Sequence, residues 1–294
     1  MKRIEILFKT VGLIICLLFL FSTVDYPKIE YIFFVLILIF LGIPHGAIDH
    51  LTSDPMISRK GLLVFLLLYI SLIGFYLISW LYFPSFSLLA FLLMSGYHFG
   101  QTHFIHRSVK KGRIPLYISR GLFFIFVILG GNFWLSQSIL NPILDITFLE
   151  THLYKILIGS LLLTISIQLV AKITFTWIDF FELIVLGLIL YLSPLMIGFI
   201  VYFGFWHALP SMISEYDYLK YYPKYNSLKK FGLQLLPFSL ISLVGIGLIL
   251  FFGMNYLDQN EIILVFFVLI SLISFPHIFY MDRFWKKTTN TGRN

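Results

Sequence analysis

Residues 61–82 read GLLVFLLLYISLIGFYLISWLY, an apolar run without a charged side chain. A helix rises about 1.5 Å per residue, so this run can cross the roughly 30 Å hydrocarbon core of a bilayer. Similar runs recur along the chain and leave no polar stretch in which a soluble domain would fold. The segment predicts an all-helical membrane bundle, because open sheet edges are not stable in lipid.

The composition supports the same fold class. The chain has 294 residues, of which 59% are hydrophobic, 19% aromatic and 12% charged. Soluble domains carry roughly 25% charged residues, about twice as many. The single cysteine, Cys16, excludes disulfide scaffolds and four-cysteine metal sites. Any metal site must therefore use histidines and carboxylates.

The apolar runs predict a single polytopic transmembrane domain, residues 1–294, with about ten spans. Segments 177–193 and 195–213 are separated only by Ser193-Pro194, where we expect a tight turn. The chain shows no internal repeat or linker. The expected helices are 6–24, 30–48, 61–82, 86–106, 114–135, 153–172, 177–193, 195–213, 231–252 and 261–281.

The net charge of +7 indicates topology rather than a nucleic-acid partner. With ten spans, all of the 21 Lys and Arg residues except Lys28 and Lys155 fall on one side of the membrane. Basic residues concentrate on the cytoplasmic side of membrane proteins. We therefore expect both termini in the cytoplasm, a multi-pass protein in the inner (plasma) membrane, and no nucleic-acid partner.

Four of the eight histidines lie late in even-numbered spans: His45, His98, His207 and His277. With a cytoplasmic N-terminus these spans run inward, so the four imidazoles share one depth in the cytoplasmic third of the bilayer. A Gly or Pro precedes each within three residues, where helices can bend or approach closely. Ionisable groups inside spans are costly and usually functional. The pattern predicts a shared metal or cofactor site, although a single interfacial histidine is more often only hydrogen-bonded.

Imidazole ligands favour iron, copper or zinc over magnesium or calcium. Asp49 follows His45 by four residues and Gln101 follows His98 by three, so each is expected on the face of its histidine, as a partner that fixes the tautomer. Aromatic residues beside the histidines are expected to line an apolar substrate slot, or else to be packing filler. They are Tyr97, Phe99, Phe203, Phe205, Trp206, Phe275 and Phe279.

Other polar residues fit simpler interpretations. His50 and His103 either line the entrance to the site or pack at the interface, and Glu215 and Asp217 are expected in a solvated cytoplasmic loop. A haem-binding electron-transfer protein and a histidine-based transporter stay open as alternative functions. Zinc hydrolase chemistry is less favoured, since the chain has no HExxH motif.

The stretches around the histidines resemble those of a known family. Residues 44–50, PHGAIDH, resemble the PHGALDH signature of the Brp/Blh family, the membrane-bound β-carotene 15,15'-dioxygenases. Residues 97–100 (YHFG), 205–207 (FWH) and 275–277 (FPH) resemble later family segments in the same order. Size and hydropathy are similar over the whole chain.

The resemblance implies a non-haem Fe(2+) enzyme that adds O2 across the central double bond of β-carotene to give retinal. It places His45, His98 and His207 at family iron-ligand positions, and it implies membrane lipid and a retinal-accepting rhodopsin as further partners. The family usually has another histidine four residues after the third ligand, and here that position is Ser211. We therefore expect His277 to complete the catalytic metal site, or the metal to be bound differently.

Overall fold

The computed structural model describes residues 2–22, 27–107, 109 and 111–290. Within them every regular element is a helix, so the all-helical fold class is confirmed. Lys110, Arg293 and the end of the expected helix 6–24 lie outside the described residues. The chain divides into two compact units, Met1–Leu38 with Leu92–Pro210 (unit 1) and Ile39–Phe91 with Ser211–Asn294 (unit 2). The expectation of a single domain stays a prediction.

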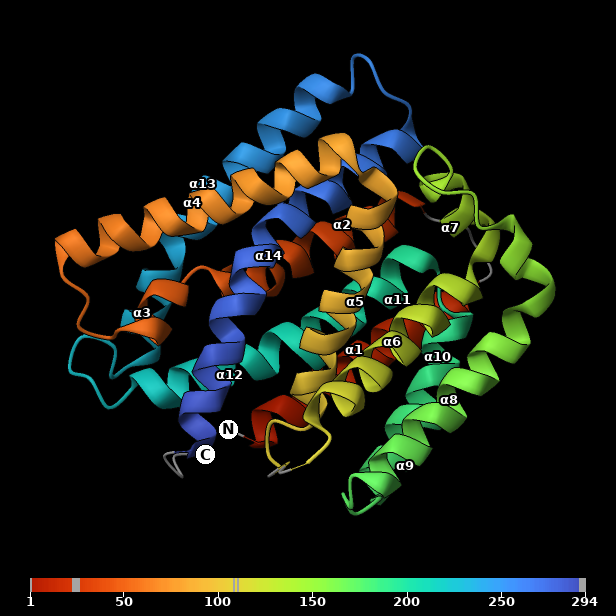
Figure 1. The fold of residues 1–294 in the computed structure, drawn as a ribbon, viewed down its shortest axis with the longest axis horizontal. Coiled ribbons are helices and arrows are strands. Elements are labelled where there is room, and N and C mark those ends of the chain that lie inside the picture. The colour runs from red at the N-terminus through yellow and green to blue at the C-terminus, as the bar shows by residue number, and fades with distance from the viewer. Residues whose placement is uncertain (1, 23–26, 108, 110, 291–294) are drawn as a thin grey trace. The chain divides into compact units, whose positions relative to one another are not determined.

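Unit 1 is built around α6 (Arg113–Gly131). On it pack α8 (Leu153–Val170) and α10 (Gly187–Leu192), and α8 runs alongside α6 in Figure 1. The other elements are α1 (Lys2–Leu20), α2 (Pro27–Ile37), the last turns of α5 (Pro84–His103), α7 (Phe133–Leu140), the 3₁₀ helix η3 (Thr147–His152), α9 (Trp177–Phe180), the π helix η4 (Phe181–Leu186), α11 (Leu195–Val201) and the π helix η5 (Tyr202–Ala208).

Unit 2 is built around α14 (Gln259–Asn290). It packs against α3 (Asp49–Ser53), α4 (Arg59–Tyr82) and α13 (Leu228–Gly253), and α4, α13 and α14 lie near one another in Figure 1. The serines Ser58 and Ser227 cap α4 and α13 by accepting a backbone N–H of the first turn. The remaining elements are the π helix η1 (Leu38–Gly42), which begins in unit 1, the 3₁₀ helix η2 (Pro44–Gly46), the first turns of α5, and α12 (Leu209–Leu219), whose first two residues belong to unit 1.

All ten expected segments are helical over most of their described residues, but two are interrupted. Segment 30–48 changes from α to π helix at Leu38 and to a 3₁₀ turn at Pro44, because proline lacks an N–H and clashes with the preceding turn. Segment 114–135 breaks at Asn132, between α6 and α7. The expected break at Ser193-Pro194 is confirmed, since α10 ends at Leu192 and α11 begins at Leu195.

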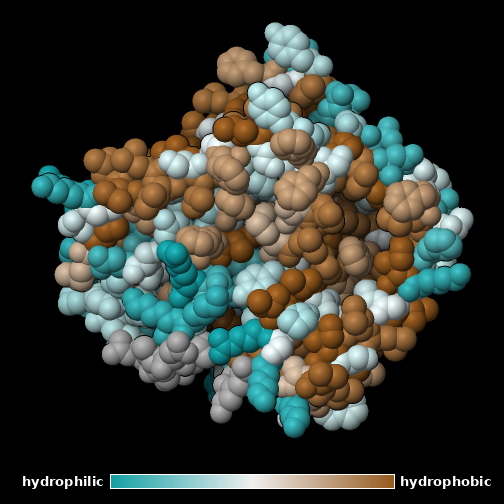
Figure 2. Space-filling view, viewed as in Figure 1, coloured by the Kyte–Doolittle hydropathy of each residue, from teal (hydrophilic) through white to brown (hydrophobic). Residues whose placement is uncertain are grey.

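Seven helices of the described chain are long and apolar enough to cross a membrane. They are Lys28–Ser53, Arg59–Tyr82, Arg113–Gly131, Thr147–Val170, Leu195–Leu219, Leu228–Gly253 and Gln259–Thr288. Their outer faces match this environment: on α4 the side chains of Leu63, Val64, Leu67 and Leu68 are each more than half exposed. Figure 2 shows apolar side chains over much of the visible face. The count of ten spans stays a prediction.

Candidate metal-binding histidines

Unit 1 brings His98 and His207 together. His98 lies in α5 and His207 in the π helix η5, and their ring centroids are 4.5 Å apart. Both side chains are buried, at 2% and 1% exposure, and each offers a ring nitrogen within 4.8 Å of one on the other. Phe99 and Phe203 pack against the His207 ring at 4.6 and 5.7 Å. The pair is therefore two imidazoles in an apolar setting.

Close helix packing holds α5 in place. Gly96 and Gly100 form a small-xxx-small pattern on α5, and they face Gly121 and Tyr117 of α6. A Cβ on Gly100 would collide with the carbonyl oxygen of Tyr117, and one on Gly121 with the carbonyl oxygen of Gly96. Small residues such as glycine allow backbones to approach this closely in membrane bundles. Gly96, which precedes His98, thus allows the close helix approach that the sequence suggested.

The π helix η5 sets the direction of His207. A π turn contains one more residue than an α turn, and such turns recur at functional sites. Tyr202, at the start of η5, hydrogen-bonds through its hydroxyl to Nε2 of His103 at 3.0 Å. His103 in turn donates from Nδ1 to Glu182 at 2.7 Å, and Glu182 belongs to the second π helix, η4. The His103 side chain thus links helices of unit 1 through two hydrogen bonds.

A network of buried ion pairs surrounds His103. Arg120 is fully buried in α6 and donates to Asp179 at 3.1 Å and to Glu182 at 3.2 Å. Arg107 makes a further hydrogen-bonded ion pair with Asp179. From the sequence, Arg120 was expected only as one of the positive charges on the cytoplasmic side of the membrane. Because removing one partner of a buried ion pair leaves an uncompensated charge, this network fixes how the helices of unit 1 pack.

The network reaches solvent through Glu5. Lys9 contacts Glu182 at 3.6 Å and Glu5 at 2.9 Å, and Glu5 also accepts from the half-exposed His106. Partial burial opposes ionisation of Glu5, but the hydrogen bond from His106 and the charge of Lys9 together lower its pKa to about 2. Glu5 is therefore ionised throughout the physiological range.

Unit 2 brings His45 and His277 together. Their ring centroids are 4.7 Å apart, both are buried, and their ligand atoms also lie within 4.8 Å of each other. Gly46 makes room for this contact, since a Cβ there would lie 3.3 Å from Nδ1 of His277. The chain thus has four buried histidines able to bind a metal, two in each unit. That all four share one ion stays a prediction.

Asp49 partners a different histidine from the one the sequence indicated. Its carboxylate accepts from Nδ1 of His277 at 2.9 and 3.1 Å, whereas Nδ1 of His45 donates to the carbonyl oxygen of Gly42. The expected pairing of Asp49 with His45 is wrong, because the backbone between them is a 3₁₀ turn and a bend rather than an α helix. Gln101 Oε1 lies 3.4 Å from Nδ1 of His98, the pairing that the spacing indicated, and its role at a metal site stays a prediction.

Tyr69 is a site residue that the sequence did not reveal. Its hydroxyl lies 3.1 Å from Oδ2 of Asp49 and 3.3 Å from the carbonyl oxygen of Ile273. Tyr69, Asp49 and His277 form a hydrogen-bonded chain across α4, α3 and α14. One tyrosine among 17 carries no signal by itself, and only the packing of α4 on α14 brings it to Asp49.

The donor set fits a transition metal. In His45, His98 and His277 the Nδ1 nitrogen is bound to an oxygen acceptor, which fixes the tautomer and leaves Nε2 with its lone pair. Metal-binding histidines usually have this arrangement, with the second nitrogen donating to a carboxylate or carbonyl oxygen. Neutral imidazole ligands suit iron, copper or zinc.

Comparison with known proteins agrees with this donor set. A family model described as beta-carotene 15,15'-dioxygenase matches residues 36–285. The chain belongs to the beta-carotene 15,15'-dioxygenase family. A beta-carotene 15,15'-dioxygenase from the uncultured marine bacterium 66A03 is 27% identical over 261 residues, which cover 84% of this chain and 90% of that protein. No solved structure gives a significant match.

Membership of the dioxygenase family confirms the resemblance seen in the sequence, and all four histidines lie inside the matched region. Ser211, at the position where the family usually has a further histidine, is fully buried in α12. Glu215, one turn later, is also fully buried, and both its carboxylate oxygens lack a hydrogen-bond partner among the described residues. The expected solvated loop around Glu215 is therefore wrong, because these residues form a helix whose Leu219 enters the core of unit 2.

The seven aromatic candidates of this dioxygenase-family chain do not all face a histidine. In unit 1, Phe99 and Phe203 contact His207, but Phe205 packs against Phe8 of α1, Trp206 lies under Lys9, and Tyr97 contacts Tyr117. In unit 2, Phe275 stacks on Tyr76, and Phe279 is 47% exposed beneath Arg283. Neighbouring residues in a helix project from different faces, so the position of an aromatic residue next to a histidine in the sequence did not predict contact with that histidine.

Proposed function

We propose that the protein is an iron-dependent oxygenase that cleaves the central 15,15' double bond of β-carotene, or of a related carotenoid, with O2 to give retinal. Two buried histidine pairs in a chain of the dioxygenase family carry the proposal. We propose that His45, His98, His207 and His277 together bind one Fe(2+) ion and form the catalytic site. The ion would supply the chemistry that lets O2 react with a polyene, and both oxygen atoms end in the two aldehyde products.

The protein residues would orient the ligands and exclude water. Gln101 and Asp49 hold the Nδ1 atoms of His98 and His277, so their Nε2 atoms are directed for binding. Neutral ligands leave the positive charge of the metal uncompensated. Phe99 and Phe203 cover His207 with apolar surface, and in a water-poor site reactive species are protected from hydrolysis.

The membrane setting suits an all-carbon substrate, which dissolves only in the bilayer. We propose a ten-span protein of the inner (plasma) membrane with both termini in the cytoplasm. The basic residues of the cytoplasmic loops support this orientation. A rhodopsin is the proposed acceptor of the retinal, on the strength of the family resemblance.

Expression in a bacterium that accumulates β-carotene tests the proposal. Loss of colour with appearance of retinal is expected, and with labelled O2 both aldehydes should carry the label. His98→Ala should abolish both cleavage and bound iron. Unchanged β-carotene beside stoichiometric iron would refute this substrate, and a Soret absorption band in the purified protein would favour the haem-binding alternative.

A second experiment asks which residue replaces the histidine expected at position 211. We propose that His277 fills this role, because it is buried beside His45 and held by Asp49. His277→Ala should lose the metal, whereas Ser211→Ala should keep it. Adding Ser211→His to His277→Ala should restore binding if position 211 can reach the ion. Full iron content in His277→Ala alone would exclude His277 as a ligand.

A further inference from the structure

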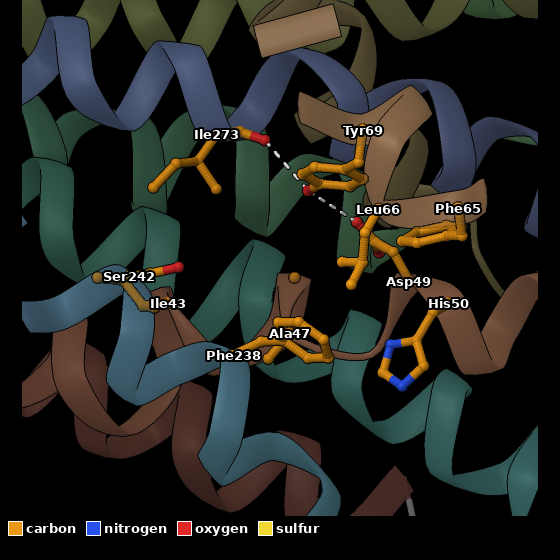
Figure 3. Close-up of a pocket in the computed structure, with 11 residues that line it drawn as sticks. Ile43, Ala47, Asp49, His50, Phe65, Leu66, Tyr69, Phe238, Ser242 and Ile273 are labelled. Carbon is orange, nitrogen blue, oxygen red and sulfur yellow. Dashed lines mark hydrogen bonds between the residues drawn. The ribbon is translucent and has the colours of Figure 1, made fainter. Parts of the chain in front are cut away.

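Unit 2 contains a small pocket, whose lining residues are drawn in Figure 3. Gly46 and Asp49, which both contact His277, form part of its wall. Its volume is about 80 Å³, well below the roughly 300 Å³ at which drug-sized ligand pockets begin. The pocket can therefore take one slender end of a long molecule, but not the whole molecule.

The pocket lies among helices whose outer faces are apolar. The part of its wall that lies beyond residues 43–50 comes from α4, α13 and α14, which contribute Phe65, Leu66, Phe238 and Ile273 among others. Their helix neighbours Leu67 and Ile241 are 58% and 66% exposed on surfaces suited to lipid. A ligand that reaches the pocket between these helices must therefore be lipophilic.

His50 gives the pocket a specific polar group. Its side chain is 8% exposed and lies between the rings of Phe65 and Phe238, at 6.1 and 5.1 Å. Within the described part of the chain no residue hydrogen-bonds to this imidazole, although it lines the pocket. A buried imidazole always carries at least one N–H donor, and buried donors are almost always satisfied. The His50 nitrogens are not among the buried side-chain atoms that lack a partner, so they reach the open space of the pocket, where the N–H can donate to a bound molecule.

The neighbouring polar groups determine what that partner is. The Tyr69 hydroxyl has one proton, which it directs to Asp49 and Ile273 (Figure 3). Asp49 already accepts from His277. The pocket donors that stay available are the N–H of His50 and the hydroxyl of Ser242. Two available donors favour a ligand that brings an acceptor oxygen. A carbonyl group meets this requirement.

We propose that this pocket binds the carbonyl end of a lipophilic polyene, with His50 donating to the carbonyl oxygen. The identification of that polyene as retinal rests on the proposed function. Its aldehyde end is slender enough for the pocket, while its ring end would stay in the lipid between α4 and α13. The pocket then holds the product after it leaves the histidines and before it enters the bilayer.

The test measures retinal binding directly and does not depend on turnover. The purified full chain is placed in bilayers of ether-linked phosphatidylcholine, which has no ester carbonyls, and titrated with all-trans retinal without O2. His50→Phe keeps the aromatic packing but removes the donor. It should weaken retinal binding about three- to tenfold, as expected for one hydrogen bond. The carbonyl stretching frequency of bound retinal should rise in the same variant.

Two further variants separate recognition from folding. His50→Gln retains an N–H donor and should bind retinal nearly as the unchanged protein does. His152→Phe makes the same replacement at an exposed position in η3 and should have no effect. Equal retinal affinity in His50→Phe and His50→Gln would overturn the proposal. So would a large loss of retinal affinity on changing to ester-linked phosphatidylcholine, since the pocket would then belong to lipid carbonyls.

The same preparations distinguish this inference from the proposed function. If the protein binds retinal through His50 but leaves β-carotene intact, the pocket proposal is supported and the proposed cleavage of β-carotene is refuted. If the protein cleaves β-carotene but His50→Phe binds retinal as tightly as the unchanged protein, the proposed function is supported and the pocket proposal is refuted. Because His50 is not a proposed metal ligand, iron content should be unchanged in every His50 variant.

Discussion

Replacing Asp49 by Asn should weaken metal binding without weakening the metal-free fold. The side chain is 2% exposed and accepts from His277 at 2.9 and 3.1 Å and from Tyr69 at 3.1 Å. Asparagine has nearly the same shape but no charge, so it loses the charge-assisted bond that holds Nδ1 of His277.

The magnitude follows from two independent estimates. A hydrogen bond to a charged group contributes about 1.5–3 kcal/mol. Changing a residue that orients a metal ligand typically lowers metal affinity about 10–100-fold, and each tenfold step is about 1.4 kcal/mol. The two ranges agree, so Asp49→Asn should raise the Kd for Fe(2+) by about one to two orders of magnitude. The metal-free Tm should change little, because the buried charge disappears together with its bond.

Competition with a chelator of known affinity under anaerobic conditions gives the Kd, and thermal unfolding of metal-free protein gives the Tm. Asp282→Asn is the matched control: it removes a carboxylate from α14 that pairs with the exposed Lys286. Its metal affinity should equal that of the unchanged chain. If Asp49→Asn also retained full affinity, the reasoning that Asp49 acts on the metal through His277 would fail.

Three more outcomes test the fold around the site. Gly100→Ala should destabilise the protein by about 1–3 kcal/mol or more, because its Cβ would collide with a backbone carbonyl oxygen that is fixed in the helix. Gly74→Ala is the control for thermal unfolding: nothing lies within 4 Å of its Cβ, so it should be neutral or slightly stabilising. Arg120→Met should lower stability by about 3–5 kcal/mol, since two carboxylates would stay buried without their shared cation; an unchanged Tm would contradict this. The pKa of Glu5 is lowered to about 2, so the ionised carboxylate stabilises the fold fully above its ordinary pKa of 4.5, and this stabilisation is lost as the pH falls toward 2. Between pH 4.5 and pH 2 the Tm should therefore fall less in Glu5→Gln than in the unchanged protein.

The sequence was sufficient for the helices and the choice of histidines. Hydrophobic runs long enough for a membrane are a strong signal, and few polar groups compete with His45 or His98 as site residues. Gly96 also predicted close packing, because small residues before His98 allow backbones to approach. These features depend on residue type and local spacing, which the sequence contains directly.

Partners that depend on helix register were not predictable. Asp49 was expected on the face of His45 because an unbroken α helix was assumed, whereas Pro44 changes the local geometry. Tyr69 and Arg120 act through contacts with residues far away in the sequence. The π turns have no sequence signature comparable to proline at a helix break, so the direction of residues after them could not be derived from spacing.

The π turn that carries His207 has a consequence for how related chains vary in length. An α helix rotates about 100° per residue, so deleting one residue from Tyr202–Ala208 could restore a regular α helix and turn everything beyond the deletion by about that angle. His207 would then point away from His98 with its residue type unchanged. A relative that lacks one residue here could therefore retain every histidine in an alignment and still not form this pair.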